Sequence, residues 1–182
     1  PWVVAKWAMS MDGRTSPAEG EGGALSGTRA ARLVHDLRGR VEAVAVGVGT
    51  VLADDPRLTC RRPGGPPHGR PQPIAVVFDS ALRTPLEANV VRESSPARPL
   101  LLFTARPRTA KAAALAALPG VAVIPAAGAD GRVDLTLALD ALHAVGVRRL
   151  LLEGGGTLAG AFLREGLVDQ VAALVAPRLL GG

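Results

Sequence analysis

The feature that most constrains the fold is a series of short, continuously apolar runs that alternate with helix-like segments. Residues 43–48 and 100–104 are built almost entirely from Ala, Val, Leu and Phe, and polar side chains do not alternate along them. Such strands are buried on both faces, as in a parallel sheet that helices cover on each side. Further strands are expected at 3–9, 74–78, 121–124, 147–152 and 168–175. The sequence therefore predicts a three-layer α/β fold, in which a mainly parallel central sheet lies between two layers of helices.

Helical spacing marks the segments between these strands. In the first, apolar residues recur at positions 30, 33, 34 and 37, with Ser26 expected to cap the helix and Gly39 to end it. A short helical turn is expected after Thr50, and longer helices at 109–118, 135–145 and 157–165. The stretch 60–73 holds five prolines in fourteen residues, which predicts an irregular loop because proline lacks a backbone donor.

Composition narrows the class of protein. A hydrophobic fraction of 48% over 182 residues suits one domain with a real core. The net charge of +5 comes from scattered arginines, and the chain has only three Phe and two Trp, so a nucleic-acid surface is not expected. No apolar run reaches the ~18 residues of a membrane span, and no signal peptide is recognised. The single cysteine, Cys60, suits a reducing compartment, so we expect a cytoplasmic protein.

The domain is expected to run over 1–182 as one unit. The chain starts at Pro1 without an initiator methionine, and it stops just after a strand-like run. Both ends are those expected of a domain excised from a longer chain and lacking its last C-terminal strands.

Three strand-to-helix turns carry the candidate chemistry, because ligands of such sheets bind beyond the carboxyl ends of the strands. In the first turn, Glu153 precedes three glycines at 154–156, which fit either a tight turn or bare backbone that cradles a phosphate. The second, 45–56, offers Thr50 and Asp54, and it fits a plain packing site equally well. In the third, 6–16, Lys6 is either an edge residue that reaches solvent or a catalytic group.

Other chemistries lack their motifs. His35, His68 and His143 are far apart, and no H-x-x-x-H or C-x-x-C pair is present to bind a metal. The G-x-S-x-G nucleophile elbow is absent, as is the zinc-deaminase signature H-x-E with P-C-x-x-C. We therefore expect no metal site and no nucleobase deamination by this chain.

The three turns together indicate a protein family far more specifically than any one of them does alone. The stretches "AKWAMSMDGRTS", "VGVGTVLADDPRLTCR", "PIAVVFDSALRTP" and "LLLEGGGTLAGAFLREGLVDQVAALVAPRLLGG" occur in that order. They closely resemble the reductase domain of the riboflavin-biosynthesis pyrimidine deaminase/reductases. The resemblance covers essentially the whole chain except the proline-rich loop and 87–98, and it implies a dihydrofolate-reductase-like fold.

The resemblance implies an NADPH-dependent oxidoreductase that reduces the ribosyl group of 5-amino-6-(5-phosphoribosylamino)uracil to the ribityl form. Lys6 and Glu153 would be catalytic, with Lys6 stabilising or protonating the nascent heteroatom and Glu153 holding the sugar hydroxyls. The residues implied to contact the cofactor are Ala8, Thr50, Asp54, Ser80, Gly155, Gly156, Thr157, Leu158, Ala159, Gly160 and Ala161. Those implied to contact the substrate are Gly22, Arg38, Leu58, Arg61 and Glu153.

The same resemblance implies the partners of the chain. Arg38 and Arg61 would grip the 5′-phosphate of the substrate in forked hydrogen bonds. Asp12 would line the same cleft, and Arg83 and Arg106 are candidates for the 2′-phosphate of NADPH. A homodimer is expected, together with a deaminase domain that is either fused or separate, and neither nucleic acid nor membrane is expected as a partner.

One departure from the family pattern leaves alternatives open. The family commonly reads G-E-S-x-W-I-T-G where this chain reads "GEGGALSG", so Gly22 and Ala24 replace a serine and a tryptophan. A reductase of a pteridine or another small carbonyl or imine is one alternative. A nucleotide-binding module without turnover, or a basic nucleic-acid binder, is another. Arg38 and Arg61 favour a phosphorylated substrate.

Overall fold

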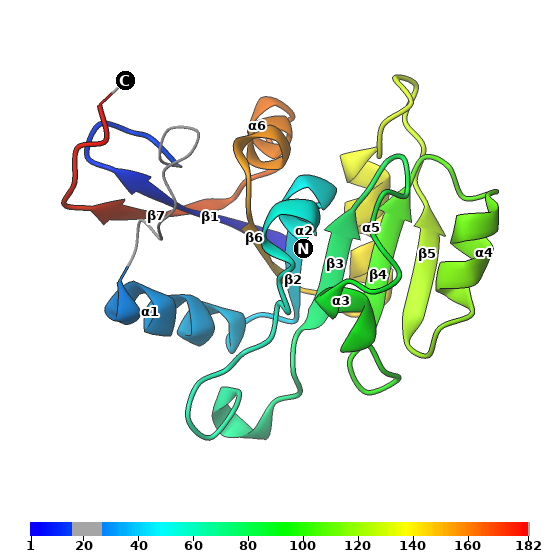
Figure 1. Cartoon of the computed structure of the whole chain (residues 1–182), viewed down its shortest axis with the longest axis horizontal. Coiled ribbons are helices and arrows are strands. Elements are labelled where there is room, and N and C mark those ends of the chain that lie inside the picture. The colour runs from blue at the N-terminus through cyan, green and yellow to red at the C-terminus, as the bar shows by residue number, and fades with distance from the viewer. Residues whose placement is uncertain (16–26, 182) are drawn as a thin grey trace.

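The computed structural model describes residues 1–15 and 27–181, which form one seven-stranded sheet (Figure 1). The strands are β1 (Trp2–Ser10), β2 (Ala43–Gly47), β3 (Ile74–Phe78), β4 (Leu100–Thr104), β5 (Val121–Pro125), β6 (Arg149–Glu153) and β7 (Gln170–Ala176). Their order across the sheet is β5-β4-β3-β2-β6-β1-β7, and every registered strand pair is parallel. The predicted parallel sheet is confirmed, and each strand expected from the sequence is present.

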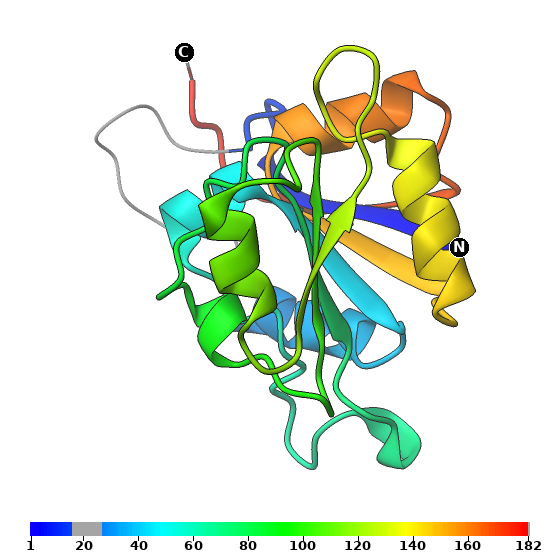
Figure 2. The same cartoon turned by 90° about the vertical axis from the view of Figure 1, so that its right-hand side faces the viewer.

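Helices cover both faces of this sheet. On one face lie α1 (Thr28–Arg38), α2 (Val48–Asp54), α3 (Asn89–Arg92) and α4 (Ala110–Ala116), and on the other lie α5 (Leu135–Ala144) and α6 (Gly156–Arg164). Figure 2 shows the yellow α5 and the green α3 and α4 on opposite sides of the strands. The predicted three layers are therefore confirmed. None of the helices in the described ranges is both long and apolar enough to cross a membrane.

The core is divided between these two layers because side chains alternate along each strand. Leu151 packs into the cluster beneath α1–α4, whereas Leu150 and Leu152 pack into the cluster beneath α5 and α6. In the second cluster the ring of Phe78 lies edge-on to that of Phe162 on α6, with centroids 5.5 Å apart. By the same alternation, Glu153 faces the layer of α1.

The helices differ from the prediction in several details. α1 begins at Thr28 with Gly27 as its N-cap, and Ser26, the expected cap, lies outside the described residues. Its apolar stripe is only partly covered, since Leu33 is 45% exposed. The proline-rich loop holds one short 3₁₀ helix, η1 (Pro67–Gly69). α3 has no counterpart in the prediction, because a helix of four residues shows no apolar periodicity.

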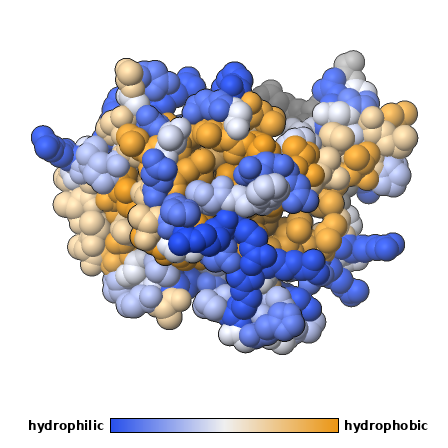
Figure 3. Space-filling view, turned by 180° about the vertical axis from the view of Figure 1, so that it is seen from behind, coloured by the Kyte–Doolittle hydropathy of each residue, from blue (hydrophilic) through white to orange (hydrophobic). Residues whose placement is uncertain are grey.

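β7 forms one edge of the sheet and carries apolar side chains toward solvent. Val171 is 47% exposed and Val175 is 54% exposed, and Trp2 on the neighbouring β1 is 51% exposed. Seen from behind, the half of the molecule that holds β7 and β1 has orange, apolar surface beside blue, polar groups (Figure 3). An exposed apolar edge of this kind is typical of a surface that a further strand or another protein covers.

Candidate active site

The carboxyl ends of β1, β2, β3 and β6 open into one large cavity of about 1420 Å³. Its walls come from these strand ends, from α2 and α6, and from the segment 128–136 between β5 and α5. Residues of all three predicted turns line it. The cavity lies at the edge where parallel α/β sheets bind their ligands, so the fold brings the three turns into one site.

The glycine turn after β6 leaves backbone open to this cavity. Gly154 has φ of +107°, and a Cβ there would lie 2.5 Å from the Thr50 hydroxyl oxygen, so only glycine fits. That hydroxyl accepts a hydrogen bond from the Gly155 N–H at 3.3 Å. Within the described part of the chain, a Cβ at Gly155 or Gly156 would meet no atom within 4 Å, and α6 has no side-chain cap. The free N–H groups at the start of a nine-residue helix can therefore hold a phosphate.

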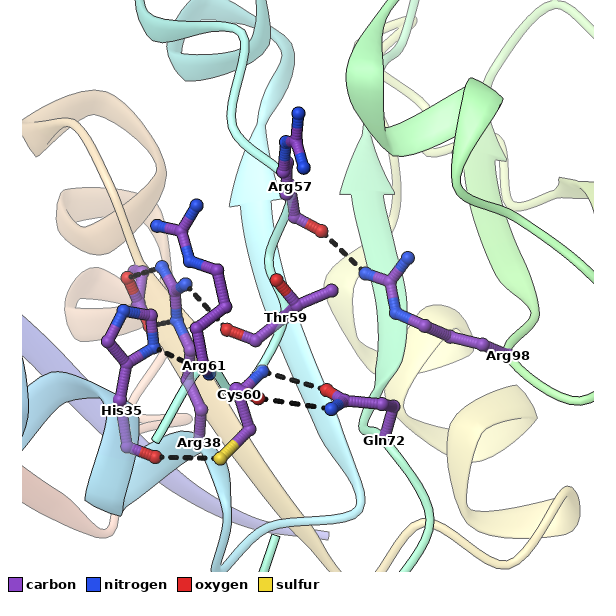
Figure 4. A network of polar contacts seen from close by, with 9 residues as sticks. His35, Arg38, Arg57, Thr59, Cys60, Arg61, Gln72 and Arg98 are labelled. Atoms are coloured by element: carbon purple, nitrogen blue, oxygen red, sulfur yellow. Dashed lines mark hydrogen bonds and ion pairs between the residues drawn. The ribbon is translucent and has the colours of Figure 1, made fainter. Parts of the chain in front are cut away.

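A buried ion pair lies at the end of the same strand. Arg38, the last residue of α1, donates from Nε to Glu153 Oε1 at 2.7 Å and from Nη2 to Oε2 at 2.9 Å. The Nη1 of Arg38 donates to the main-chain oxygen of Thr59 at 3.1 Å. Figure 4 shows the Arg38 side chain reaching between α1 and the segment that contains Thr59. The fork of Arg38 is thus directed at Glu153 and not at an open cleft.

Lys6 lies beside this pair. It is registered with Glu153 across β1 and β6, so both side chains lie on the face of the sheet that α1 covers. Burial lowers the pKa of Lys6, and the positive charge of Arg38 lowers it further, while the negative charge of Glu153 opposes the shift. The three groups form a partly desolvated acid–base cluster next to the cavity that Lys6 lines.

Most residues expected to contact the cofactor line the cavity. They are Ala8, Thr50, Asp54, Ser80, Gly155, Gly156, Thr157, Leu158 and Ala161, and Arg83 lines it as well. Ala159 and Gly160 do not, because successive residues of a helix point in different directions. Arg106 is also outside the lining.

Four of the residues expected to contact the substrate are described, and none of them is part of the cavity lining: Arg38, Leu58, Arg61 and Glu153. The Leu58 side chain is 1% exposed and packs in the core, so only its main chain, at φ of +55°, can face a ligand. The Arg61 side chain is exposed and extends toward the carboxyl end of β2 (Figure 4). Gly22, like the neighbouring Ala24, lies outside the described residues.

Asp12 does not line the cavity. Its carboxylate accepts hydrogen bonds from the N–H groups of Leu180, at 3.1 and 3.2 Å, and Gly181, at 2.9 Å. Hydrogen bonds from Ser10 and from this backbone lower the pKa of Asp12 to about 2. The carboxylate therefore ties the turn after β1 to the segment after β7.

The segment 128–136 was not predicted from the sequence as part of the site. Arg132 lines the cavity from this segment, and its side chain is 70% exposed near Asp130, at 3.8 Å. Arg164, in the last turn of α6, is a second cation that lines the cavity and was not predicted. No motif marks these residues, and their only signal is that 128–136 follows the carboxyl end of β5. Within 1–15 and 27–181, no cluster of three His, Cys, Asp or Glu side chains could hold a metal ion.

An all-parallel sheet with an open glycine turn and a buried acid–base cluster at one edge is typical of α/β enzymes that bind a nucleotide. The chain matches the family model of the RibD C-terminal domain over residues 1–182. It belongs to this family. The resemblance identified from the motifs is confirmed.

Individual relatives agree with this assignment. The chain is 41% identical over 182 residues to a Methanothermobacter thermautotrophicus protein named 2,5-diamino-6-ribosylamino-4(3H)-pyrimidinone 5′-phosphate reductase, covering 100% of this chain and 80% of the relative. It is 37% identical to the Archaeoglobus fulgidus protein of the same name, covering 100% of this chain and 83% of the relative.

A solved structure gives the same result for the fold. Acinetobacter baumannii RibD superimposes with a TM-score of 0.79 at 33% identity, over 100% of this chain and 47% of that chain. The chain thus spans about half the length of this bacterial protein. The predicted dihydrofolate-reductase-like architecture is confirmed by this match.

Proposed function

We propose that this chain is an NADPH-dependent reductase of riboflavin biosynthesis, which converts the ribosyl group of a ribosylaminopyrimidine 5′-phosphate into a ribityl chain. The observation that carries the proposal is the open glycine turn beside the buried cluster of Lys6, Arg38 and Glu153. The glycine turn would bind an anionic nucleotide, and the cluster would donate a proton and contact the sugar. The names of the archaeal relatives support this activity.

The cavity fits a dinucleotide. The pyrophosphate of NADPH would lie against the first N–H groups of α6, where Gly155 and Gly156 leave room for it. Thr50 and Asp54 would contact the nicotinamide half, and Ser80 would contact the adenosine half. Arg83 and Arg132 also line the cavity, and they would supply the charge that a 2′-phosphate requires. When bound, NADPH supplies the hydride, and the protein supplies position and charge.

The buried cluster would serve the substrate. Hydride addition at C1′ of the opened sugar leaves a heteroatom that needs a proton, and the ammonium of Lys6 donates it. Each oxygen of Glu153 accepts one hydrogen bond from Arg38 and keeps further lone pairs for the sugar hydroxyls. We assign Arg38 to holding this carboxylate in place. The exposed guanidinium of Arg61 is then the group for the 5′-phosphate.

The pyrimidine ring of the substrate is either deaminated or diamino. The uracil form is expected where a fused or separate deaminase acts first, whereas the archaeal relatives are named for the diamino form. The reacting C1′ belongs to the sugar, so the chemistry assigned to Lys6 and Glu153 is the same for both.

Turnover tests the proposal directly. Purified chain is mixed with NADPH and either pyrimidine, and the loss of reduced-nicotinamide absorbance is followed. We expect oxidation with one or both substrates, and slower oxidation when NADH replaces NADPH. Absence of oxidation with both pyrimidines at high NADPH would overturn the proposed function.

We also propose a cytoplasmic homodimer, with β7 as part of the interface. The exposed Val171 and Val175 on the edge strand support the dimer, because an uncovered apolar edge favours association. The buried free thiol of Cys60 suits the reducing cytoplasm. Sedimentation of the wild-type chain and of Val171→Lys tests the assembly, with a monomer expected only for the variant.

A further inference from the structure

The segment that presents Arg61 has an unusual set of hydrogen-bond partners. Residues 57–61 form neither helix nor strand, yet Cys60 and Leu58 are almost fully buried. In the described part of the chain, main-chain groups of this segment bond to side chains and not to other main chain. Buried backbone groups need such partners, so these side chains determine the course of the segment.

Two of the side chains act on one side of the segment. The Arg61 N–H donates to His35 Nδ1 at 3.2 Å, and Arg38 donates to the Thr59 oxygen. Both come from the last two turns of α1. The Cys60 thiol donates to the main-chain oxygen of His35 at 3.2 Å.

The other side is held by side chains from two loops. Gln72 accepts from the Cys60 N–H through Oε1 at 2.8 Å and donates from Nε2 to the Cys60 oxygen at 3.0 Å. The buried Arg98 donates from Nη2 to the Arg57 oxygen at 2.5 Å. Figure 4 shows His35 and Arg38 on one side of the segment and Gln72 and Arg98 on the other.

We propose that His35 and Gln72 are positioning residues, which fix the main chain at Cys60 and Arg61 so that the Arg61 guanidinium is held ready for a phosphate monoester. The identity of the substrate rests on the proposed function, whereas the fixing of the main chain by His35 and Gln72 does not. Fixing the main chain on both sides of a long side chain reduces the conformational freedom lost when that side chain binds.

The bond from Arg61 also fixes the state of His35. Because the main-chain N–H can only donate, Nδ1 must be an acceptor and the imidazole must be neutral, with its proton on Nε2. Burial lowers the pKa of His35, and the positive charges of Arg38 on its own helix and of Arg61 on the segment lower it further. A hydrogen bond with the Thr59 main chain and the negative charge of Glu153 at the end of β6 oppose this shift. Protonation of His35 would replace this hydrogen bond with repulsion, so binding of the phosphate should weaken in acid.

The matched variants are His35→Ala, which removes the acceptor, and His35→Asn, whose Oδ1 replaces Nδ1 but does not titrate. Gln72→Leu removes both bonds to Cys60, and His68→Ala is the control because His68 lies exposed in η1. We expect His35→Ala, which loses one hydrogen bond, to raise KM for the phosphorylated substrate about three- to tenfold. Gln72→Leu, which loses two, should raise KM at least as much, and kcat should change little in either variant. His35→Asn should restore KM to near the wild-type value at neutral pH. In acid it should reduce the rise of KM to the part that protonation of the phosphate itself causes.

Two measurements need no turnover. Amide hydrogen exchange at Arg61 should be about three- to tenfold faster in His35→Ala and close to wild type in His35→Asn. Ribose 5-phosphate should shift the NMR signal of the Arg61 side chain in the wild type, and more weakly in His35→Ala. A wild type that turns over, with unchanged KM and exchange in His35→Ala and Gln72→Leu, would overturn the inference and leave the function standing. A wild type that fails to turn over, yet binds ribose 5-phosphate with this dependence on His35, would overturn the proposed function and leave the inference standing.

Discussion

The guanidinium of Arg38 and the carboxylate of Glu153 meet in a two-bond, buried ion pair, although the residues are 115 positions apart in the sequence. Their side chains are only 11% and 10% exposed. The pair joins the end of α1 to the end of β6, and it also fixes the carboxylate beside Lys6. One interaction therefore serves both the packing of the domain and the geometry of the proposed site.

Replacement of Glu153 by Gln should reduce both the stability of the domain and the activity of the proposed site. Gln presents an NH₂ group to the guanidinium and leaves the buried charge of Arg38 uncompensated. We expect a loss of about 3 kcal/mol in the free energy of unfolding, measured by urea denaturation. Turnover should fall about tenfold to a hundredfold, because a hydrogen bond to a charged group is lost.

Asp36→Asn is the matched control for stability. The Asp36–Arg62 pair has a 3.4 Å contact, but its side chains are 41% and 36% exposed. Solvent screens such a pair, so the loss should stay below about 1 kcal/mol. Equal losses of stability in the two variants would contradict the larger stabilising contribution assigned to the buried pair.

The two lysines of the chain, Lys6 and Lys111, allow a second comparison. Lys6→Met should reduce turnover about a hundredfold, because it removes the proton donor, while Lys111→Met on α4 should not. The wild-type kcat should fall as pH rises through the lowered pKa of Lys6, below the ordinary value of 10.5.

Lys6→Met should not destabilise the fold, in contrast to its effect on turnover. A lowered pKa means that folding favours the neutral amine, so the stabilising contribution is fully present above pH 10.5 and is lost as pH falls through the lowered pKa. At neutral pH the buried ammonium thus opposes folding. Lys6→Met should therefore unfold at the same or a higher urea concentration than wild type, and a large drop in that midpoint would contradict the assignment.

The layers and the edge that carries the site could be predicted, because apolar runs and helical spacing are local properties of the sequence. The runs at 43–48 and 100–104 lie within about one residue of β2 and β4. The glycine turn could also be located, since the glycines at 154–156 follow a strand and precede a helix.

The pairing of side chains could not be predicted in the same way. Arg38 was expected to grip a phosphate, and nothing in its neighbourhood in the sequence shows that Glu153 occupies its fork. Leu58 reads as an ordinary loop residue, yet it is buried with φ of +55°. The segment 128–136 has no motif, and it joins the site only because β5 ends at the same edge as β3.

Gly155→Ala tests the proposed phosphate site. Its φ of −65° suits alanine, so the fold should persist while the new Cβ fills space that the pyrophosphate needs. We expect about tenfold weaker NADPH binding, the loss of roughly 1.4 kcal/mol, in a fluorescence titration. Gly27→Ala is the matched control, since Gly27 is also an N-cap and a Cβ there would meet no atom of the described residues within 4 Å.

Gly154→Ala should behave differently from Gly155→Ala. At φ of +107°, with the Thr50 hydroxyl 2.5 Å from the new Cβ, the backbone must shift or strain. We expect a loss of about 1–3 kcal/mol in the free energy of unfolding, seen in thermal melting. Equal stability of the two variants would show that the turn does not require glycine at Gly154.

Asp12 should make the attachment of the C-terminal segment depend on pH. Its pKa is lowered to about 2, mainly by hydrogen bonds from Ser10 and Leu180, so the folded state favours the carboxylate. The attachment is fully present above the ordinary carboxyl value of 3.8 and is lost as pH falls through about 2. Hydrogen exchange at the Leu180 and Gly181 amides, corrected for intrinsic rates, should therefore accelerate over this range. In Asp12→Asn, whose amide does not titrate, the corrected rates should be faster at neutral pH and should not change between pH 3.8 and 2; protection in wild type that persists below pH 2 would contradict the assignment.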